Sequence, residues 1–400
     1  MYLLEAAGGG MGKGALPMNV DVWQILDVGS IWMREFASAM ARTHPVVAWW
    51  PEMRSFGALE GWERIEQISE PTLEVHRYPL QRGYARTPIR QVLPYQVALL
   101  KRMRARCRDE KRTALICSTP FYAPVAEQWR GPVVYYVTDL TAGYATVDAA
   151  QVKALDRRMC RVAAAVCPNS RRLAAYLQDE AGCAAEKITV VPNATRESNI
   201  APRPLLEPGP LPPQVGQLSR PIAGVIGNLS GNMDWRLLAS AVEGTPWLTW
   251  LFVGPTAPIA DKEQESARSR VQHSTRAHFT GAKPYGDLQG FARAFDVAVL
   301  PYLKTEPTYS GSSTRFYEHV AACRPMLATR GFAELLEKPP LLELGDTSDE
   351  MIRGLERLRG VCFHDGLETA RWEASRSGTW EERVRMLTGA LAAAMLELSM

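Results

Sequence analysis

Two series of short apolar runs, each alternating with longer amphipathic stretches, constrain the fold of this 400-residue chain most strongly. Strands that alternate with helices predict βαβ units, because parallel neighbours need a long crossover that is usually a helix. A proline-dense segment separates the two series, with seven prolines between residues 201 and 221. Proline at this density prevents regular structure and indicates a semi-rigid connector. The pattern therefore predicts two doubly wound α/β domains, as expected for a chain longer than one core usually organises.

The expected elements follow from the positions of the apolar runs. In the first series, strands are expected at 22–27, 45–50, 72–78, 113–117, 132–137, 162–167 and 188–192, and helices at 31–42, 148–161 and 170–180. In the second, strands are expected at 222–227, 248–253, 277–280, 296–301, 325–329 and 340–344, and helices at 234–243, 286–295, 312–323, 347–359 and 380–398. We expect a flexible tail (1–17), a first domain (18–200), a linker (201–221), a second domain (222–375) and a C-terminal helix (376–400). In such sheets ligands bind at the carboxyl ends of the strands, here in a cleft between the domains.

Composition excludes several classes of protein. Apolar residues at 46% and charged residues at 22% are typical of a globular chain, and a net charge of +3 does not indicate a nucleic-acid partner. The seven cysteines are scattered without CxxC spacing, and the six histidines show no ligand spacing, so neither a metal site nor a disulfide framework is expected. No apolar stretch reaches the about 18 to 20 residues that cross a bilayer. Without a signal-peptide pattern, the expected location is the cytoplasm.

The segment 309–326 (YSGSSTRFYEHVAACRPM) carries the clearest chemical signal. Gly311, Ser312 and Ser313 precede an amphipathic helix, whose unpaired N–H groups and dipole suit a diphosphate. Arg315 places a positive charge in the first turn, where the dipole alone favours an acid, so an anion is expected nearby. Glu318 follows on the same side and could accept hydrogen bonds from a ribose diol. Taken in isolation, the segment favours the simpler interpretation, with Ser312 as an N-cap and Arg315–Glu318 as a surface ion pair.

Asp139 is the candidate catalytic residue. It follows the strand in 133–144 (VVYYVTDLTAGY), at the carboxyl edge that faces the expected cleft. A carboxylate there could deprotonate an acceptor hydroxyl, but it could also cap the following turn, and the residues leave both open. Gly29 and Ser30 follow the first strand and would form a tight turn on the phosphate side of the first domain.

Residues 82–112 carry ten basic side chains against only Asp109 and Glu110. Within this stretch, 92–107 can form a helix with Leu93, Val97 and Leu100 on one side, followed by Met103. A basic amphipathic helix suits an anionic membrane surface. The same spacing also suits an ordinary core-facing helix with a solvated basic face.

Residues 279–302 and 312–329 together resemble the donor-binding half of GT-B glycosyltransferases of the family-4 ("glycosyl transferases group 1") type. Residues 296–302 (DVAVLPY) resemble the family's D-V-x-L-x-P-Y strand. In the K-x-x-E-x-x-A-x-G-x-P helix motif, the Lys, Glu and Pro places are taken by Arg315, Glu318 and Pro325, with Cys323 where glycine is usual. Residues 163–173 and 188–194 resemble segments near the end of the family's first domain. The helix at Trp380 resembles a C-terminal helix that packs across both domains.

The resemblance implies a role for each matching residue. Ser312, Ser313, Thr314 and Arg315 would hold the pyrophosphate, and Glu318 the ribose. Thr280 and Gly281 would lie beside the base, and the Gly227–Asn228 turn would approach the phosphates, with Tyr302 also on the donor side. The first domain (18–200) would bind the acceptor and the second (222–375) the nucleotide sugar. The implied C-terminal helix crosses back to the first domain.

Two departures from the family-4 pattern concern charge. Many members carry an Arg and a Lys after the first strand of the second domain, but 226–235 (IGNLSGNMDW) has neither. Ser310 stands eight residues before Glu318, where those members have another Glu. Residues 133–144 also resemble a segment of the inverting glucuronosyltransferase of xanthan synthesis, whose base lies at the place of Asp139. Its S-S-M-K-x-x-Q aligns with residues 312–318.

The resemblance as a whole implies a metal-independent transferase without a cofactor. It would move a sugar from a nucleotide-sugar donor, UDP-sugar being favoured, to a glycan or lipid-linked acceptor in polysaccharide or glycoconjugate synthesis. Residues 82–112 would allow a peripheral position on the inner face of a membrane. Two alternatives stay open: a catalytically silent nucleotide-binding homologue, and a sugar-nucleotide epimerase.

Overall fold

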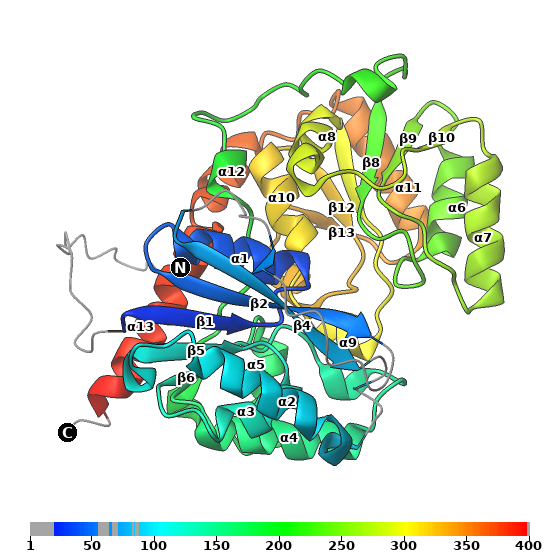
Figure 1. The fold of residues 1–400 in the computed structure, drawn as a ribbon. Helices are drawn as coiled ribbons and strands as arrows, with labels where there is room; N and C mark the ends of the chain where they lie inside the picture. Colours follow the sequence, from blue (N-terminus) through cyan, green and yellow to red (C-terminus); the bar gives the residue numbers. More distant parts are fainter. Residues whose placement is uncertain (1–19, 55–63, 66–70, 82–83, 85–87, 398–400) are drawn as a thin grey trace.

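The computed structural model describes residues 20–54, 64–65, 71–81, 84 and 88–397, which form two parallel-sheet α/β domains of Rossmann-like architecture (Figure 1). This confirms the predicted fold class. The expected tail at 1–17 lies outside the described residues. Within 201–221 only Pro213–Val215 form a regular element, a 3-10 helix. The exact domain limits drawn from the prolines stay a prediction.

The first sheet has seven strands in the order β3-β4-β2-β1-β5-β6-β7. Their bounds are β1 Val22–Leu26, β2 Val46–Arg54, β3 Arg64–Ile65, β4 Leu73–Gln81, β5 Thr113–Cys117, β6 Val133–Tyr135 and β7 Ala165–Val166. All neighbours pair in parallel except β3, which lies antiparallel on the edge strand β4. Strands β5 and β6 are buried at every residue, as expected where helices cover both faces of a parallel sheet.

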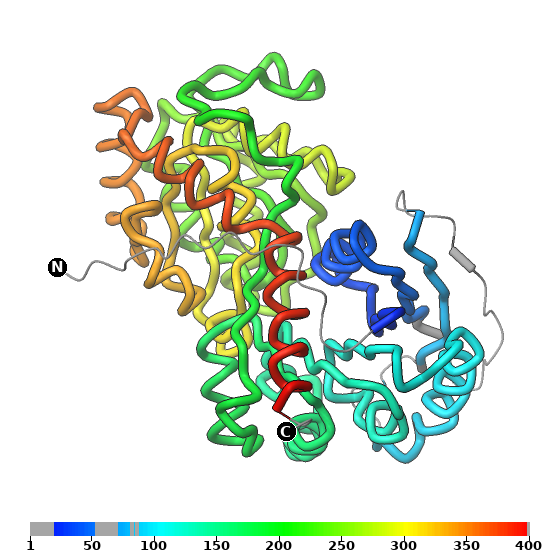
Figure 2. Tube along the Cα trace, turned by 90° about the vertical axis from the view of Figure 1, so that its left-hand side faces the viewer, coloured from blue at the N-terminus to red at the C-terminus, as the bar shows by residue number. Residues whose placement is uncertain are grey.

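Helices α1 (Ile31–Ala41) and α13 (Trp380–Glu397) pack on one face of this sheet, where Phe36, Trp380 and Leu387 join one apolar cluster with Trp23 and Ile25 of β1. The other face carries α2 (Ile89–Arg104), α3 (Ala123–Ala126), α4 (Ala149–Val162) and α5 (Arg171–Asp179). Figure 2 follows α12 (Glu368–Arg376) and then α13, in orange and red, from the second domain down to the first. The C-terminal helix therefore crosses back to the first domain, as predicted.

The second sheet has six parallel strands in the order β10-β9-β8-β11-β12-β13. Their bounds are β8 Ile222–Ile226, β9 Thr249–Val253, β10 Ala277–Phe279, β11 Val297–Leu300, β12 Met326–Ala328 and β13 Glu343–Leu344. One face carries α6 (Trp235–Gly244), α7 (Lys262–His273) and α11 (Ser348–Gly360). The other carries α8 (Leu288–Ala294) and α10 (Thr314–Ala322). The short helix α9 (Glu306–Ser310) lies between β11 and α10 and reaches the first domain beside α5.

Several sequence-based expectations differ from the structure. The strand expected at 188–192 is absent, since in this described region only Ile188 pairs, through an isolated bridge to Val166. The strand expected at 162–167 is reduced to β7 because α4 continues to Val162. Helix α7 was not predicted, because its buried apolar side chains are only Ala267 and Val271. Its start is instead set by Asp261, whose carboxylate accepts from two backbone N–H groups.

The expected apolar face of the basic helix is wrong in phase. In α2, Leu93 is 36% exposed and Val97 is 55% exposed. The buried side chains are Val92, Tyr95, Gln96, Leu99, Leu100 and Met103. This set follows the spacing of a helix with a covered stripe, whereas Leu93 and Val97 lie beside it and face solvent. The helix therefore has a core-facing stripe and, separately, two exposed apolar side chains among its basic residues.

No helix in the described ranges is long and apolar enough to cross a membrane. Those same residues contain no group of three His, Cys, Asp or Glu side chains that could hold a metal ion.

Candidate functional site

A cleft of about 340 Å³ lies between the carboxyl edges of the two sheets and takes side chains from both domains. Most of the predicted site residues line it, namely Asp139, Gly227, Asn228, Tyr302, Ser312, Ser313, Thr314 and Arg315. The other lining residues are Ile31, Trp32, Thr138, Tyr144, Asn193, Asn232, Pro307, Thr308, Gly311 and Phe332. Residues about 300 positions apart in the chain thus meet in one cavity, as the topology of facing carboxyl edges requires.

The N-terminus of α10 opens onto this cleft. Its cap is Ser313, whose hydroxyl accepts from the N–H of Phe316 at 3.3 Å, so the interpretation of Ser312 as the N-cap is wrong. The N–H groups of Thr314 and Arg315 have no protein acceptor among the residues that the structure describes. Two free donors and the positive end of the helix dipole therefore face the cleft, an arrangement that suits an anion.

Arg315, in the first turn of this helix, forms an ion pair with Glu318 in the second. The side chains are only 17% and 5% exposed, so the alternative of a surface ion pair is wrong. Arg315 lines the cleft, whereas Glu318 is not among the lining residues. The guanidinium is thus held in place by a buried carboxylate and still presents charge to the cleft. The predicted role of Glu318 toward a ribose stays a prediction.

The loops after β8, β9 and β11 meet at the carboxyl edge of the second sheet, next to Arg315. Gly227 follows β8 with φ 155°, and a Cβ there would lie 3.1 Å from the Met233 side chain, 3.6 Å from the Tyr302 hydroxyl and 4.0 Å from Arg315 Nε. Gly254 follows β9 with φ 141°, and a Cβ there would lie 1.8 Å from the Gly227 carbonyl oxygen. Glycine at both positions lets the backbone approach the space beside Arg315 closely.

Besides Glu318, four predicted site residues lie outside the residues that line the cleft. Gly281 accepts from the N–H of Gly254 at 3.1 Å, which places it behind the Gly227 turn. Thr280 lines a separate hollow at the β10 edge of the sheet. Gly29 and Ser30 precede α1, and only the next two residues, Ile31 and Trp32, reach the cleft. The roles predicted for these four residues stay predictions.

Asp139 lies on the first-domain side of the cleft. Its Oδ2 accepts from the Tyr144 hydroxyl at 2.8 Å. The next 3-10 helix begins at Thr141 after Leu140 with no side chain capping it, while the Asp139 carboxyl has a hydrogen bond with the Leu140 backbone. Both interpretations of Asp139, as a base and as a residue that caps the turn, stay open. Burial raises the pKa of Asp139 above its ordinary value of 3.8, and the hydrogen bond from Tyr144 opposes that rise. This carboxylate has the position and the raised basicity of a general base.

Hydrogen bonds between the domains hold the loop before α10. The Asn193 backbone N–H donates to the Ser312 hydroxyl at 3.0 Å, and its side-chain amide donates to the Ser312 carbonyl at 2.8 Å. The Ser170 hydroxyl donates to the Ser310 carbonyl oxygen. Sequence reasoning missed Asn193 and Ser170 because nothing local pairs them with residues 120 to 140 positions away.

Asp27 is a second carboxylate at the carboxyl edge of the first sheet, and sequence reasoning missed it. It directly follows β1 with φ 64°, a left-handed conformation that Asp tolerates. Burial raises its pKa from 3.8 to about 7, while a hydrogen bond with Ser118 opposes the rise. Burial, and then the charge of Asp27, raise the pKa of Tyr78 and Tyr84. Only the fold brings these hydroxyl groups around the carboxylate.

Comparison with known proteins places these features in a family context. Residues 31–194 match the family described as "Glycosyl transferase 4-like domain". The teichuronic acid biosynthesis glycosyltransferase TuaH of Bacillus subtilis (strain 168) is 23% identical over 163 residues, 40% of each chain. The 2-deoxystreptamine glucosyltransferase of Streptomyces kanamyceticus is 29% identical over 226 residues, 53% of this chain and 56% of that one. The matched segments thus span about half or less of these relatives.

Solved structures share the whole architecture. Anabaena Alr3699/HepE in complex with UDP and glucose superposes with a TM-score of 0.67 at 16% identity, covering 95% of this chain and 100% of that one. At this identity the likeness is one of fold. The structure and this comparison confirm the two-domain arrangement that the sequence predicted.

The raised pKa of Asp27 predicts a pH-dependent stability. Between pH 4 and 7 the folded state keeps a proton that the unfolded state, with a carboxyl pKa of 3.8, has released. The free energy of unfolding contributed by this group should therefore fall as pH rises across that window, by at most about 1.4 kcal/mol per pH unit. Denaturant unfolding at pH 5 and pH 8 should show Asp27→Asn gaining on the wild type at the higher pH. Asp21→Asn, an exposed carboxylate paired with Arg112, serves as the control and should show no such gain.

Proposed function

We propose that this chain, whose residues 31–194 match the family described as "Glycosyl transferase 4-like domain", transfers a sugar from a nucleotide-sugar donor to an acceptor held by the first domain. The observation that carries the proposal is the N-terminus of α10. Free N–H groups, a buried guanidinium and a glycine turn converge there on a cleft between two domains. A diphosphate fits this arrangement, because its charge meets fixed donors without a metal ion.

A UDP-sugar is the proposed donor. Anabaena Alr3699/HepE, which has the same fold, is described in complexes with UDP-glucose and with UDP and glucose. The name of the 2-deoxystreptamine glucosyltransferase indicates that it transfers a glucosyl group. Arg315 is the one cationic side chain that lines the cleft in the described structure. A donor with two phosphates therefore depends on Arg315 and the helix end together.

The proposed acceptor is a glycan or a lipid-linked sugar of a surface polymer, in line with the teichuronic acid pathway in the name of TuaH. Helix α2 supports a peripheral membrane position on the cytoplasmic face. Leu93, Val97 and Lys101 lie four residues apart in turn and are all exposed, so they form one stripe. Apolar tips within a basic surface suit an anionic bilayer. Arg82 and Arg86 of the basic stretch lie outside the described residues.

One assay distinguishes transfer from the two alternatives, a catalytically silent homologue and a sugar-nucleotide epimerase. A catalytically silent homologue would bind nucleotide but neither transfer nor hydrolyse the donor. An epimerase would convert the donor without an acceptor. Measuring UDP release from UDP-glucose and other UDP-sugars, with and without acceptor extract, distinguishes these outcomes from transfer, in which acceptor accelerates release.

Variants of the ion pair on α10 test the donor site. Arg315→Ala and Glu318→Ala should each weaken UDP binding by roughly 1.5–3 kcal/mol, about ten- to a hundredfold. Isothermal titration calorimetry measures the change. Arg330→Ala, which removes an arginine from the exposed pair with Asp346, is the matched control and should bind UDP normally. Because Arg315→Ala leaves Glu318 buried without its partner, the thermal midpoint of each variant must also be measured. Normal UDP affinity in both α10 variants would rule out this site.

Metal independence follows from the same arrangement. Transfer should continue at its full rate in excess EDTA, because the donor charge is met by Arg315 and the helix end. A rate that chelation abolishes, and that magnesium or manganese restores, would contradict the proposal. The test uses the full-length protein with and without each metal.

Asp139 is the proposed base, which makes the reaction inverting. Asp139→Asn should bind UDP normally and turn over 10²–10⁴-fold more slowly, as expected for loss of a general base. Because the base must be ionised, the rate should rise with pH through a pKa above 3.8. Tyr144→Phe removes a hydrogen bond to the ionised form, so it should move that acid limb to higher pH.

The matched control is Asp179→Asn, an exposed carboxylate at the end of α5, which should leave the profile unchanged. A near-normal rate in Asp139→Asn, or a product that keeps the anomeric configuration of the donor, would exclude Asp139 as the base.

A further inference from the structure

The acidic side chain of Glu334 forms hydrogen bonds with the loop before α10, residues 311–313, which we call the donor loop. Glu334 lies on a 3-10 helix (Ala333–Glu337) that follows β12. One carboxylate oxygen, Oε2, accepts from the Ser312 hydroxyl and from the Ser313 N–H, both at 2.9 Å. The other, Oε1, accepts from the Tyr317 hydroxyl and lies 3.3 Å from Lys338 Nζ. Its side chain is 9% exposed, so these contacts form in a largely water-free setting.

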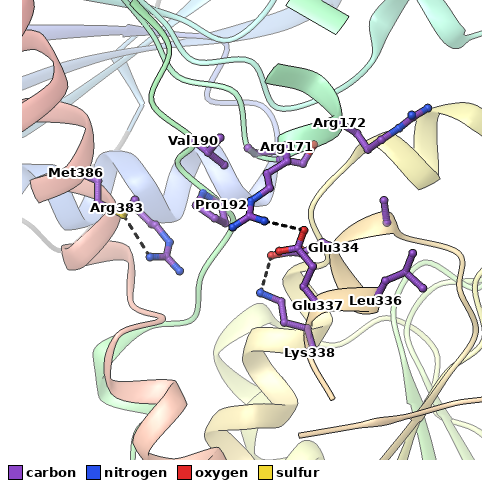
Figure 3. A pocket seen from close by; sticks show the side chains of 13 residues that line it. Arg171, Arg172, Val190, Pro192, Glu334, Leu336, Glu337, Lys338, Arg383 and Met386 are labelled. Atoms are coloured by element: carbon purple, nitrogen blue, oxygen red, sulfur yellow. Dashed lines mark hydrogen bonds and ion pairs between the residues drawn. The ribbon is translucent and has the colours of Figure 1, made fainter. Parts of the chain in front are cut away.

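Glu334 also lines a second cavity. This cavity of about 550 Å³ opens between the domains and is lined by Glu334, Glu337, Lys338, Arg171 and Arg383, among others. Figure 3 shows Glu334 on its wall, with the ion pair Arg171–Glu337 between the two domains and the pair Lys338–Glu334 within one segment. Glu334 links this wall to the donor loop through two hydrogen bonds.

The same carboxylate determines which helix-end donors remain for a ligand. The Ser313 N–H is taken by Glu334 on the rear side, and the Phe316 N–H by Ser313 itself. The N–H groups of Thr314 and Arg315 are left for the cleft. Since Ser312 also accepts from the Asn193 N–H, its hydroxyl is bonded on both sides, to Glu334 of one domain and Asn193 of the other.

We propose that Glu334 is a positioning residue for the donor diphosphate: it fixes the donor loop from behind, so that the Thr314 and Arg315 N–H groups face the cleft. The inference rests on the proposed function, since it concerns the same donor site. Loss of Glu334 should affect binding of the diphosphate and not binding of the base. The base would lie at the loops after β9 and β10, and Glu334 has no described contact with either loop.

Glu337 provides a matched comparison within the same short helix. Its carboxylate lines the same cavity and is 49% exposed. It pairs with Arg171 at 3.3 Å and has no bond to the donor loop in the described structure. Removing either glutamate deletes one negative charge from one wall of one cavity. Only one of the two deletions also releases Ser312 and Ser313.

The test compares UDP and uridine binding by calorimetry in the full chain. Glu334→Ala should weaken UDP binding at least tenfold and uridine binding less than twofold. Glu334→Gln should lie between the wild type and Glu334→Ala, because the amide oxygen can still accept from the Ser313 N–H. Glu337→Ala should stay within twofold of the wild type for both ligands. Thermal midpoints are recorded for all four proteins.

Wild-type UDP affinity in Glu334→Ala would overturn the inference while leaving the proposed function in place. Equal losses for UDP and uridine would also overturn it, because they would indicate a general loss of structure. Should Glu334→Ala not fold, Glu334→Gln keeps the shape of the side chain. It must then still lose at least threefold in UDP affinity, and an unchanged value overturns the inference. A wild-type protein that binds neither ligand would overturn the proposed function and this inference together.

Discussion

The contact between Asn193 and Ser312 is the interaction on which the site depends. Each domain alone presents only the carboxyl edge of a sheet, and a closed binding site exists only where the two edges meet. Asn193 donates two hydrogen bonds to Ser312, and Ser312 directly precedes the cap of α10. The bidentate pair between Arg196 and Glu35, at 2.5 and 2.6 Å, ties the chain just after Asn193 to α1. Helix α13 then covers the junction, since the Trp380 N–H donates to the Thr195 carbonyl.

The cleft contains little positive charge, and the one arginine that lines it in the described structure is paired with a buried carboxylate. Arg315 is the single cation of the described lining, and a lone buried guanidinium would be expensive to keep ionised without a partner. Glu318 provides that partner, and its own side chain is 5% exposed. An incoming diphosphate would add a second anion on the open side. The departure at residues 226–235, which lack an Arg and a Lys, therefore makes the helix end more important without removing the site.

How far the sequence predicts this structure depends on whether a signal is local. Helix α10 and strand β11 were predicted because their periodicity, cap and apolar run lie within a few residues. Helix α7 was missed because it is polar almost throughout and is fixed by its Asp261 cap and by packing against α6. Asp27 and Glu334 were missed for another reason: each is one carboxylate whose partners come from other strands or helices. The prediction of which face of α2 is buried was wrong because Leu93 and Val97 are apolar and yet exposed. A single sequence does not distinguish an exposed apolar residue from a buried one.

Cys323 shows how a departure from the family pattern can be harmless to the site. It ends α10 with φ 61°, the left-handed conformation in which helices commonly end on glycine. A side chain at this position carries a backbone penalty of about 1 kcal/mol relative to glycine. Cys323 is buried, and it lies at the far end of α10 from the cleft that Thr314 and Arg315 line. The substitution therefore bears on the stability of α10 and leaves its anion-binding end intact. It gives no support to a silent homologue, which would instead be expected to lose charge at Arg315 or at the Asp139 edge of the cleft.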